Sequence, residues 1–215
     1  MAKREPTVGH HRLEMDAEWG LLELSGFGRQ YVQVYSIVYA LHFGAEEEDP
    51  EERTVHAFGA FPWIGGWSAV DFYDSLRIAV PAGHRPRIVA MQYASPGYIE
   101  LAVAVGVALN IRRIVDHVCS IIERANDTYS KLYKAAMERK LLRVDARRAQ
   151  MKLARDELDF AEEATRRLAA MMGLDLMDEL ERLTETPLMR MKILFSLYRR
   201  VRDLAKIQKS KRIRF

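Results

Sequence analysis

The residues best suited to bind a metal ion fall into two groups. His10 and His11 are adjacent near the start of the chain, where nothing else in the sequence supports a metal site. The second group is acidic and lies on one predicted helix, where a di-metal centre would need a Glu-x-x-His motif that occurs nowhere in the chain. We therefore predict no metal site and interpret the second group as a solvated helix face. It comprises Glu157, Asp159, Glu162 and Glu163.

Residues for nucleophilic catalysis or phosphate binding are also poorly supported. Cys119 is predicted on the apolar side of a helix, and His117 lies on a different face, so the thiol lacks an adjacent base. The pair Gly65-Gly66 lacks the Lys-Ser/Thr of a P-loop, and no Gly-x-Ser-x-Gly motif occurs. We predict no catalytic residue and no cofactor. The aromatic residues from which an enzyme pocket could be built are as easily core residues: Trp63, Trp67 and Tyr93.

Proline and glycine divide the chain into two parts. Residues 1–97 hold six of the seven prolines and ten of the twelve glycines, whereas residues 98–186 hold no proline and only Gly106 and Gly173. Because these residues punctuate turns and interrupt helices, the pattern predicts an α+β fold. Its first part, residues 1–95, is a small module of a sheet and one helix. Its second part, residues 96–215, is a helical assembly region.

The expected elements follow from side-chain periodicity. The first part should contain strands at 31–43, 54–61 and 87–93 and a helix at 68–79, with an acidic loop at 45–53 between the first two strands. The second part should begin with a long helix at 96–139 that is apolar on all sides over 101–109 and one-sided from Ile111 onward. Helices at 144–172, with coiled-coil-like spacing, at 175–183 and from Thr186-Pro187 onward should complete an antiparallel bundle or hairpin.

The apolar run over residues 98–111 leads to the main functional hypothesis. Fourteen helical residues extend about 20 Å, short of the roughly 30 Å of a bilayer core. We therefore prefer a buried helix or a subunit interface, and shallow or oligomer-assisted membrane insertion is the alternative. Apolar faces of this size usually mark interfaces, which predicts a non-enzymatic protein that assembles with itself or with another protein. The expected assembly residues are Leu101, Val103, Val105, Val107, Leu109, Ile114, Val118 and Ile121.

Charge is unevenly distributed and suggests a second hypothesis. Residues 187–215 hold ten Lys and Arg and one acid, a net charge of +9, whereas the rest of the chain carries −6. Such a tail could pair with the acidic body of the same or another subunit, or bind an anionic membrane surface or nucleic acid. The alternative function is therefore peripheral binding of such a partner. The expected contact residues are Arg199, Arg202, Lys206, Lys209, Lys211, Arg212 and Arg214.

One part of the sequence resembles a known group of proteins. The segments 72–76, 84–89 and above all Gln92–Leu101 resemble a segment of poorly characterised bacterial proteins associated with defence and signalling gene clusters. In those proteins a short strand ends in Ser-Pro-Gly and leads into an apolar helix, whereas here the apolar stretch is shorter and Arg112-Arg113 follows it. The resemblance covers about 30 residues and implies a bacterial, non-enzymatic adaptor or effector. The single cysteine and the polar Met1–Arg12 segment predict a cytoplasmic location.

Overall fold

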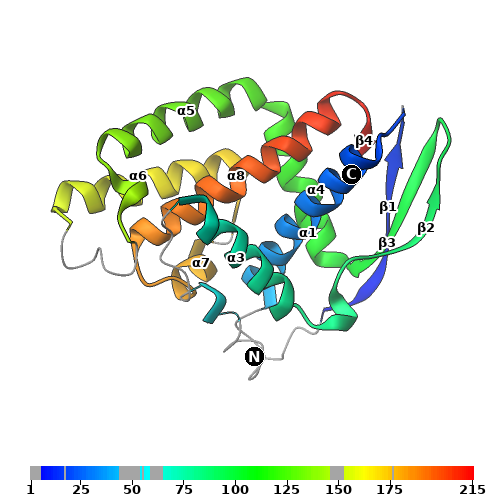
Figure 1. The fold of residues 1–215 in the computed structure, drawn as a ribbon, viewed down its shortest axis with the longest axis horizontal. Helices are drawn as coiled ribbons and strands as arrows, with labels where there is room; N and C mark the ends of the chain where they lie inside the picture. Colours follow the sequence, from blue (N-terminus) through cyan, green and yellow to red (C-terminus); the bar gives the residue numbers. More distant parts are fainter. Residues whose placement is uncertain are drawn as a thin grey trace.

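The computed structural model describes residues 6–16, 18–43, 54, 56–58, 65–145, 153–175 and 177–215, with the backbone alone for residues 65–69. The predicted α+β class is confirmed. A four-stranded antiparallel sheet stands at one side of the molecule, and helices cover one of its faces and extend away from it as a bundle (Figure 1). The predicted acidic loop at 45–53 and Trp63 lie outside the described residues.

The sheet draws its strands from both ends of the chain. Strands β1 (Val8–Met15), β2 (Arg87–Gln92), β3 (Gly97–Ala104) and β4 (Ile213–Arg214) are arranged in the order β2-β3-β1-β4. The predicted boundary between residues 95 and 96 therefore divides the β2–β3 hairpin, and the prediction of an N-terminal module with its own sheet is wrong. Because strands from both parts pair in one sheet, a single hydrophobic core runs from the sheet through the helical bundle.

Most of the helices follow the β2–β3 hairpin along the chain. The short 3-10 helices η1 (Ala82–His84) and η2 (Leu141–Arg143) follow α3 and α5. Helical residues also occur at 54 and 56–58, where a strand was predicted. The α-helices are α1 (Leu21–Phe43), α3 (Gly65–Ala79), α4 (Val105–Ser120), α5 (Ile122–Glu138), α6 (Arg155–Met172), α7 (Met177–Arg182) and α8 (Pro187–Lys209).

Helix α8 is the central element of the bundle and contacts α1, α4, α5 and α6. It begins as predicted, because the Thr186 hydroxyl accepts a hydrogen bond from the Met189 amide at 3.1 Å and Pro187 occupies the first turn. The predicted apolar seam is buried, but so is most of the circumference between Leu188 and Tyr198. The first half of this helix is thus a core helix, and only its second half is amphipathic.

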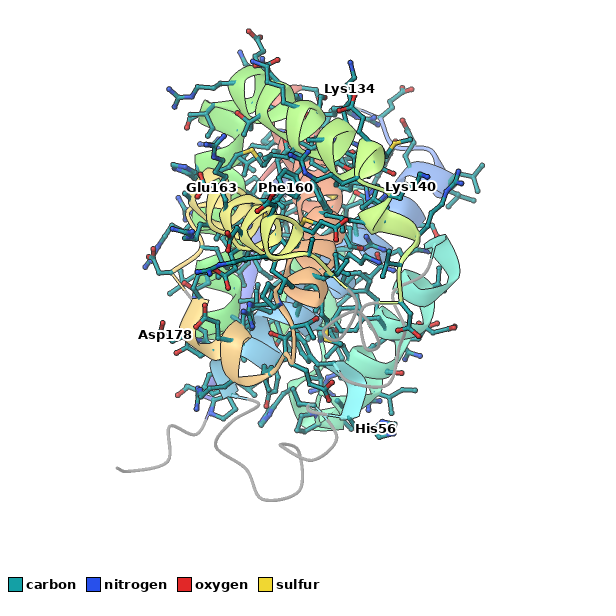
Figure 2. All side chains as sticks on the ribbon, turned by 90° about the vertical axis from the view of Figure 1, so that its left-hand side faces the viewer. His56, Lys134, Lys140, Phe160, Glu163 and Asp178 are labelled. Carbon is teal, nitrogen blue, oxygen red and sulfur yellow. The ribbon has the colours of Figure 1, made fainter. Side chains whose placement is uncertain are left out.

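The predicted long helix at 96–139 is wrong over residues 97–104, which form β3, and the helical remainder is interrupted once, at Ile121. Its one-sided pattern from Ile111 onward is confirmed, with buried residues at steps of three and four through α4 and α5. The two helices are separate because Ile121 leaves the helical conformation, at φ −118° and ψ 17°. At the end of the molecule away from the sheet, α5 lies beside α6 (Figure 2). There the Arg139 guanidinium stacks on Phe160, 4.4 Å from the ring centre.

The predicted strand at 31–43 is wrong, because these residues form the second half of α1. Their β-branched and aromatic composition favours a strand in isolation, but tertiary burial overrides propensity. Tyr31, Tyr35 and Tyr39 recur every four residues, and their rings stack along one helix face with centroids 6.4 and 6.2 Å apart. Tyr35 then anchors the helix, since its hydroxyl donates to the His84 carbonyl at 2.6 Å and accepts from the Ala104 amide at 2.9 Å.

Candidate protein-binding surface

The predicted assembly residues lie mostly in the core of a single chain. Leu101 and Val103 belong to β3, which is paired on both sides, and Val107, Ile114 and Val118 belong to the buried side of α4. Of the remaining predicted residues, Val105 and Ile121 are half-buried and Leu109 is 53% exposed. The prediction of a helix is therefore wrong for residues 101–104, which belong to β3, and right from Val105 onward. Elements of the same chain cover most of this segment: β1 and β2 flank β3, and Leu101, Val103 and Val107 pack in the common core.

The exposed apolar side chains gather at another place. Eleven large hydrophobic residues are exposed in the described part of the chain, and six of them lie on β2, at the residue after it or in the first turn of α1. Scattered exposed hydrophobic residues are ordinary, but a group on neighbouring elements marks a contact surface. We refer to these six residues as the apolar edge: Leu21, Leu22, Ile88, Val89, Met91 and Tyr93.

Strand β2 forms one open border of the sheet. It pairs with β3 on one side, and no described strand pairs with its other side. Ile88 and Met91 lie opposite Leu101 and Ile99, so they share the face of the sheet that packs on the helices. They are nevertheless 61% and 41% exposed, whereas their partners are buried. This border of the sheet therefore extends past the helices, which leaves apolar side chains beside unpaired backbone groups.

The register between β2 and β3 is interrupted at Val89. Residues Ile88 and Ala90 pair with consecutive residues of β3, so Val89 is the extra residue of a β-bulge. Val89 is 47% exposed. A bulge increases the local twist of an edge strand and limits which further strands can pair with it.

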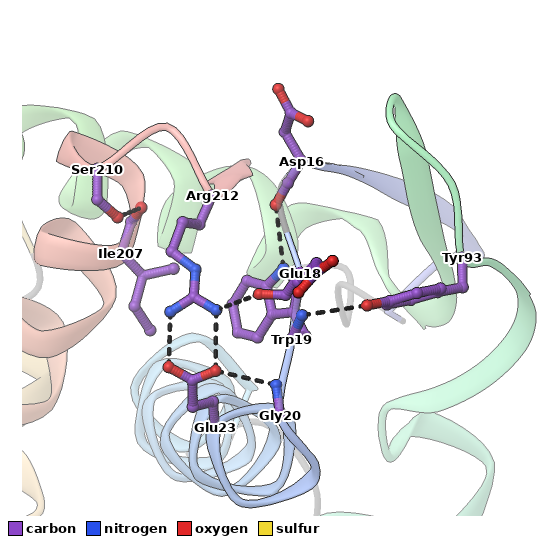
Figure 3. A network of polar contacts seen from close by, with 9 residues as sticks. All are labelled: Asp16, Glu18, Trp19, Gly20, Glu23, Tyr93, Ile207, Ser210 and Arg212. Atoms are coloured by element: carbon purple, nitrogen blue, oxygen red, sulfur yellow. Dashed lines mark hydrogen bonds and ion pairs between the residues drawn. The ribbon is translucent and has the colours of Figure 1, made fainter.

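The first turn of α1 continues this surface. Leu21 and Leu22 are 86% and 89% exposed, the highest values among the exposed large hydrophobic residues of the described chain. The Trp19 amide lies 3.4 Å from the Tyr93 hydroxyl, which brings the end of β2 next to the start of α1 (Figure 3). Sequence periodicity could not identify these residues, because exposure at a helix start follows no repeating pattern.

A clasp from the C-terminal segment fixes the start of α1. The Arg212 guanidinium donates to both carboxylate oxygens of Glu23, at 2.8 and 2.9 Å, and to the Glu18 carbonyl at 2.7 Å (Figure 3). It also stacks on Trp19, 4.4 Å from the ring centre. Glu23 accepts a further bond from the Gly20 amide, and these contacts lower its pKa from 4.5 to about 2, with the Arg212 hydrogen bond as the largest cause.

This clasp predicts a defined pH dependence. Because the folded-state pKa of Glu23 is depressed, its contribution to stability is present above about pH 4.5 and is lost as the pH falls toward 2. Wild-type protein should therefore melt at a higher temperature than the Glu23→Gln variant near neutral pH. The difference should shrink between pH 4.5 and 2. Thermal unfolding followed by circular dichroism tests this, and a difference that does not change with pH would contradict it.

Most cations predicted to bind an anionic partner are paired within the chain. Lys209 contacts Glu123 at 3.1 Å, Arg212 contacts Glu23, and Arg214 contacts Glu14 at 2.7 Å. Arg202 contacts its neighbour Asp203 at 3.3 Å. Arg199 is half-buried, and Lys206 and Lys211 are exposed. Acids of the same chain therefore neutralise much of the positive charge of the tail. Pairing with the acidic body was one of the three possibilities that its composition left open.

The two adjacent histidines cannot share a ligand. Their side chains point to opposite faces of β1, since residues alternate along a strand. His10 contacts Glu100 at 2.7 Å on the open face, whereas His11 is half-buried beside Arg112. Burial and then the Arg112 charge lower the pKa of His11. Among the residues that the structure describes, no three His, Cys, Asp or Glu side chains come together as a metal site.

Comparison with known proteins does not assign the chain to a family. No family model, curated protein or solved structure matches it. Within the described ranges, no helix combines the length and the apolar character that crossing a bilayer requires. The Ser-Pro-Gly segment is followed by strand β3, not by the apolar helix that the resemblance implies. Tyr93, one of the three aromatic residues considered for an enzyme pocket, is 64% exposed on the apolar edge.

Proposed function

We propose that this protein is a non-enzymatic assembly or adaptor protein of the cytoplasm that self-associates through the apolar edge. The observation that carries the proposal is an edge strand whose outer side has no described partner and whose apolar side chains are exposed. The contact is antiparallel pairing of β2 with β2 of a second copy. In keeping with the resemblance of Gln92–Leu101, we propose that the assembly belongs to a bacterial defence or signalling system.

Symmetry supports a second copy as the partner. Antiparallel pairing of one strand with itself is isologous, so it closes after two subunits and leaves no further open border on that side. The sequence of β2 contains Arg87 and no acid, and antiparallel pairing holds the two Arg87 side chains at opposite ends. Ile88 and Met91 of the two copies would meet on the helix-covered side of the joined sheet, where they would cover each other.

The titration behaviour of the buried groups also supports a non-enzymatic role. Burial raises the pKa of Tyr198 to about 12 and lowers that of Lys192 to about 8. Both groups bind half-buried partners: Tyr198 donates to Asn126 at 3.0 Å, and the Lys192 ammonium donates to the Val144 carbonyl at 2.5 Å. Strong pKa shifts of buried side chains that have hydrogen-bond partners accompany structural packing. A catalytic acid or base would instead be expected at a cleft.

A single substitution in β2 tests the proposal. Met91→Lys places a charge in the middle of the proposed contact, while its long stem can keep the packing of the isolated chain. We expect wild-type protein to have the mass of a dimer by light scattering and Met91→Lys to have the mass of a monomer with an unchanged melting temperature. Met137→Lys is the matched control, because Met137 is 55% exposed on α5, outside the apolar edge.

The outcomes separate the two functional hypotheses. A monomeric wild type at the highest attainable concentration, or a Met91→Lys variant that remains dimeric, would overturn self-association through β2. Binding of wild type to anionic vesicles or DNA at low salt, abolished by glutamine at Arg199, Arg202, Lys206 and Lys209, would instead support the tail hypothesis. That hypothesis has less support, because the tail cations Lys209, Arg212 and Arg214 already have acidic partners.

A further inference from the structure

A cleft of about 500 Å³ lies between the C-terminal segment, the end of β1 and helix α4. Its floor includes the apolar residues Met15, Ile213 and Phe215, each of which is at most 4% exposed. Its rim carries cationic side chains from two elements, Arg112 on α4 and Lys211 after α8. An apolar floor with a few polar groups and a volume of several hundred Å³ are typical of small-molecule sites.

The acids that line the cleft already have partners. Glu14 binds the Arg214 guanidinium at 2.7 Å, and Asp116 accepts a hydrogen bond from Gln208 at 2.6 Å. Asp16 accepts one from the Ser95 hydroxyl at 2.5 Å. A ligand that enters the cleft therefore meets acids that are already engaged.

The cations Arg112 and Lys211 are less strongly engaged. Arg112 lies 3.7 Å from Asp116, beyond hydrogen-bond distance. Lys211 has no ion-pair partner among the residues that the structure describes, and its side chain is exposed. A ligand that offers an anionic group would find these two cations available.

Lys211 is one of two non-glycine positions with positive φ in the described chain, and the other is Lys140. Lys211 has φ 59°, in the left-handed region that favours glycine. It ends α8 by donating its amide to the Gln208 carbonyl at 2.9 Å, and the next amide, of Arg212, binds the Ile207 carbonyl at 3.3 Å. Helix α6 ends in the same arrangement with Gly173 at φ 60°. At α8 the chain therefore accepts backbone strain and carries an ammonium group on the rim of the cleft.

We propose that this cleft binds a small ligand with an anionic group, a carboxylate or phosphate, on an apolar body. Lys211 and Arg112 bind the anionic group, and the floor at Met15, Ile213 and Phe215 receives the apolar part. Charge-assisted hydrogen bonds supply the affinity for the anionic group, and burial of the apolar body on the floor adds affinity that a small inorganic anion lacks. This site lies apart from β2, so it does not depend on self-association.

The variant Lys211→Gly tests the site without damaging the fold. Glycine adopts φ 59° without strain, so the melting temperature should rise, while removal of the ammonium should weaken octyl phosphate binding roughly tenfold or more. Lys140→Gly is the matched control, because Lys140 also has φ 59° but lies after α5, outside the cleft. It should also raise the melting temperature and leave binding unchanged. Isothermal titration calorimetry with octyl phosphate as the probe measures the binding.

Other probes decide the ligand class. Octyltrimethylammonium, which reverses the charge, and inorganic phosphate, which lacks the apolar body, should both bind at least tenfold more weakly than octyl phosphate. Equal binding of either probe, absence of octyl phosphate binding, or unchanged binding in Lys211→Gly would overturn the proposal. If wild-type protein sediments with phosphatidylserine vesicles and Lys211→Gly does not, the anionic group belongs to a lipid. Octyl phosphate binding without sedimentation would identify a free molecule.

Discussion

Replacing Val103 with aspartate should unfold the chain. Val103 is 1% exposed in β3, paired with Gly9 of β1, and a carboxylate there would be cut off from water. Burying an unpaired charge costs more than about 4 kcal/mol, which is comparable with the whole stability of many domains. Far-ultraviolet circular dichroism and urea unfolding should show a largely unfolded variant at neutral pH.

The control for this experiment lies six residues further along the chain. Leu109 is 53% exposed on α4, so Leu109→Asp should keep the wild-type spectrum and a melting temperature within a few degrees of wild type. If residues 101–109 instead formed a helix covered by a second subunit, both substitutions would disrupt association. A folded Val103→Asp monomer would contradict the burial of β3.

Removing the hydroxyl of Tyr35 should cost about 3 kcal/mol of unfolding free energy. This hydroxyl joins α1 to both the His84 carbonyl and the Ala104 amide, and Ala104 is fully buried. Phenylalanine would leave both backbone groups without this partner, and an unsatisfied buried group costs more than an average hydrogen bond contributes. Burial raises the pKa of Tyr35 to about 12, so the hydroxyl remains a donor across the physiological range.

The matched control for Tyr35 is Tyr93→Phe. The Tyr93 hydroxyl is exposed and lies at a long 3.4 Å from the Trp19 amide, so its loss should change the unfolding free energy by less than about 0.5 kcal/mol. Denaturant unfolding at equilibrium measures both variants. Equal effects of the two substitutions would show that the contacts of Tyr35 do not hold α1 against the sheet.

The elements that sequence could predict are those with a strong local signal. The helix at 68–79, the strand at 87–93 and the start at Thr186-Pro187 agree with α3, β2 and α8. Each of these elements is marked by a helix cap, a turn residue or an alternation of apolar and polar side chains. These signals depend on residues that are close together in the sequence. The helix predicted at 144–172 is found from Arg155 onward as α6, and residues 146–152 lie outside the described chain.

The failures occurred where long-range contacts decide the structure. Residues 101–104 are all apolar, and such a run suits a buried strand as well as a buried helix. What makes it a strand is pairing with β1, whose exposed side chains include His10, Arg12 and Glu14 and for which no strand was predicted. The apolar edge was missed for a related reason. Its exposure depends on where the sheet ends relative to the helices, and no local pattern encodes that relation.

The pairing of β1 has a consequence for synthesis on the ribosome. Its neighbour β3 lies 90 residues away where His10 faces Glu100, and its other neighbour, β4, follows α8 near the far end of the described chain. Contacts between such distant segments form late, because the intervening polypeptide must first be made and closed into a loop. A nascent chain that has emerged only as far as α3 carries β1 without either neighbour. Chaperone protection during translation should therefore matter more for this protein than for a helical bundle of similar size.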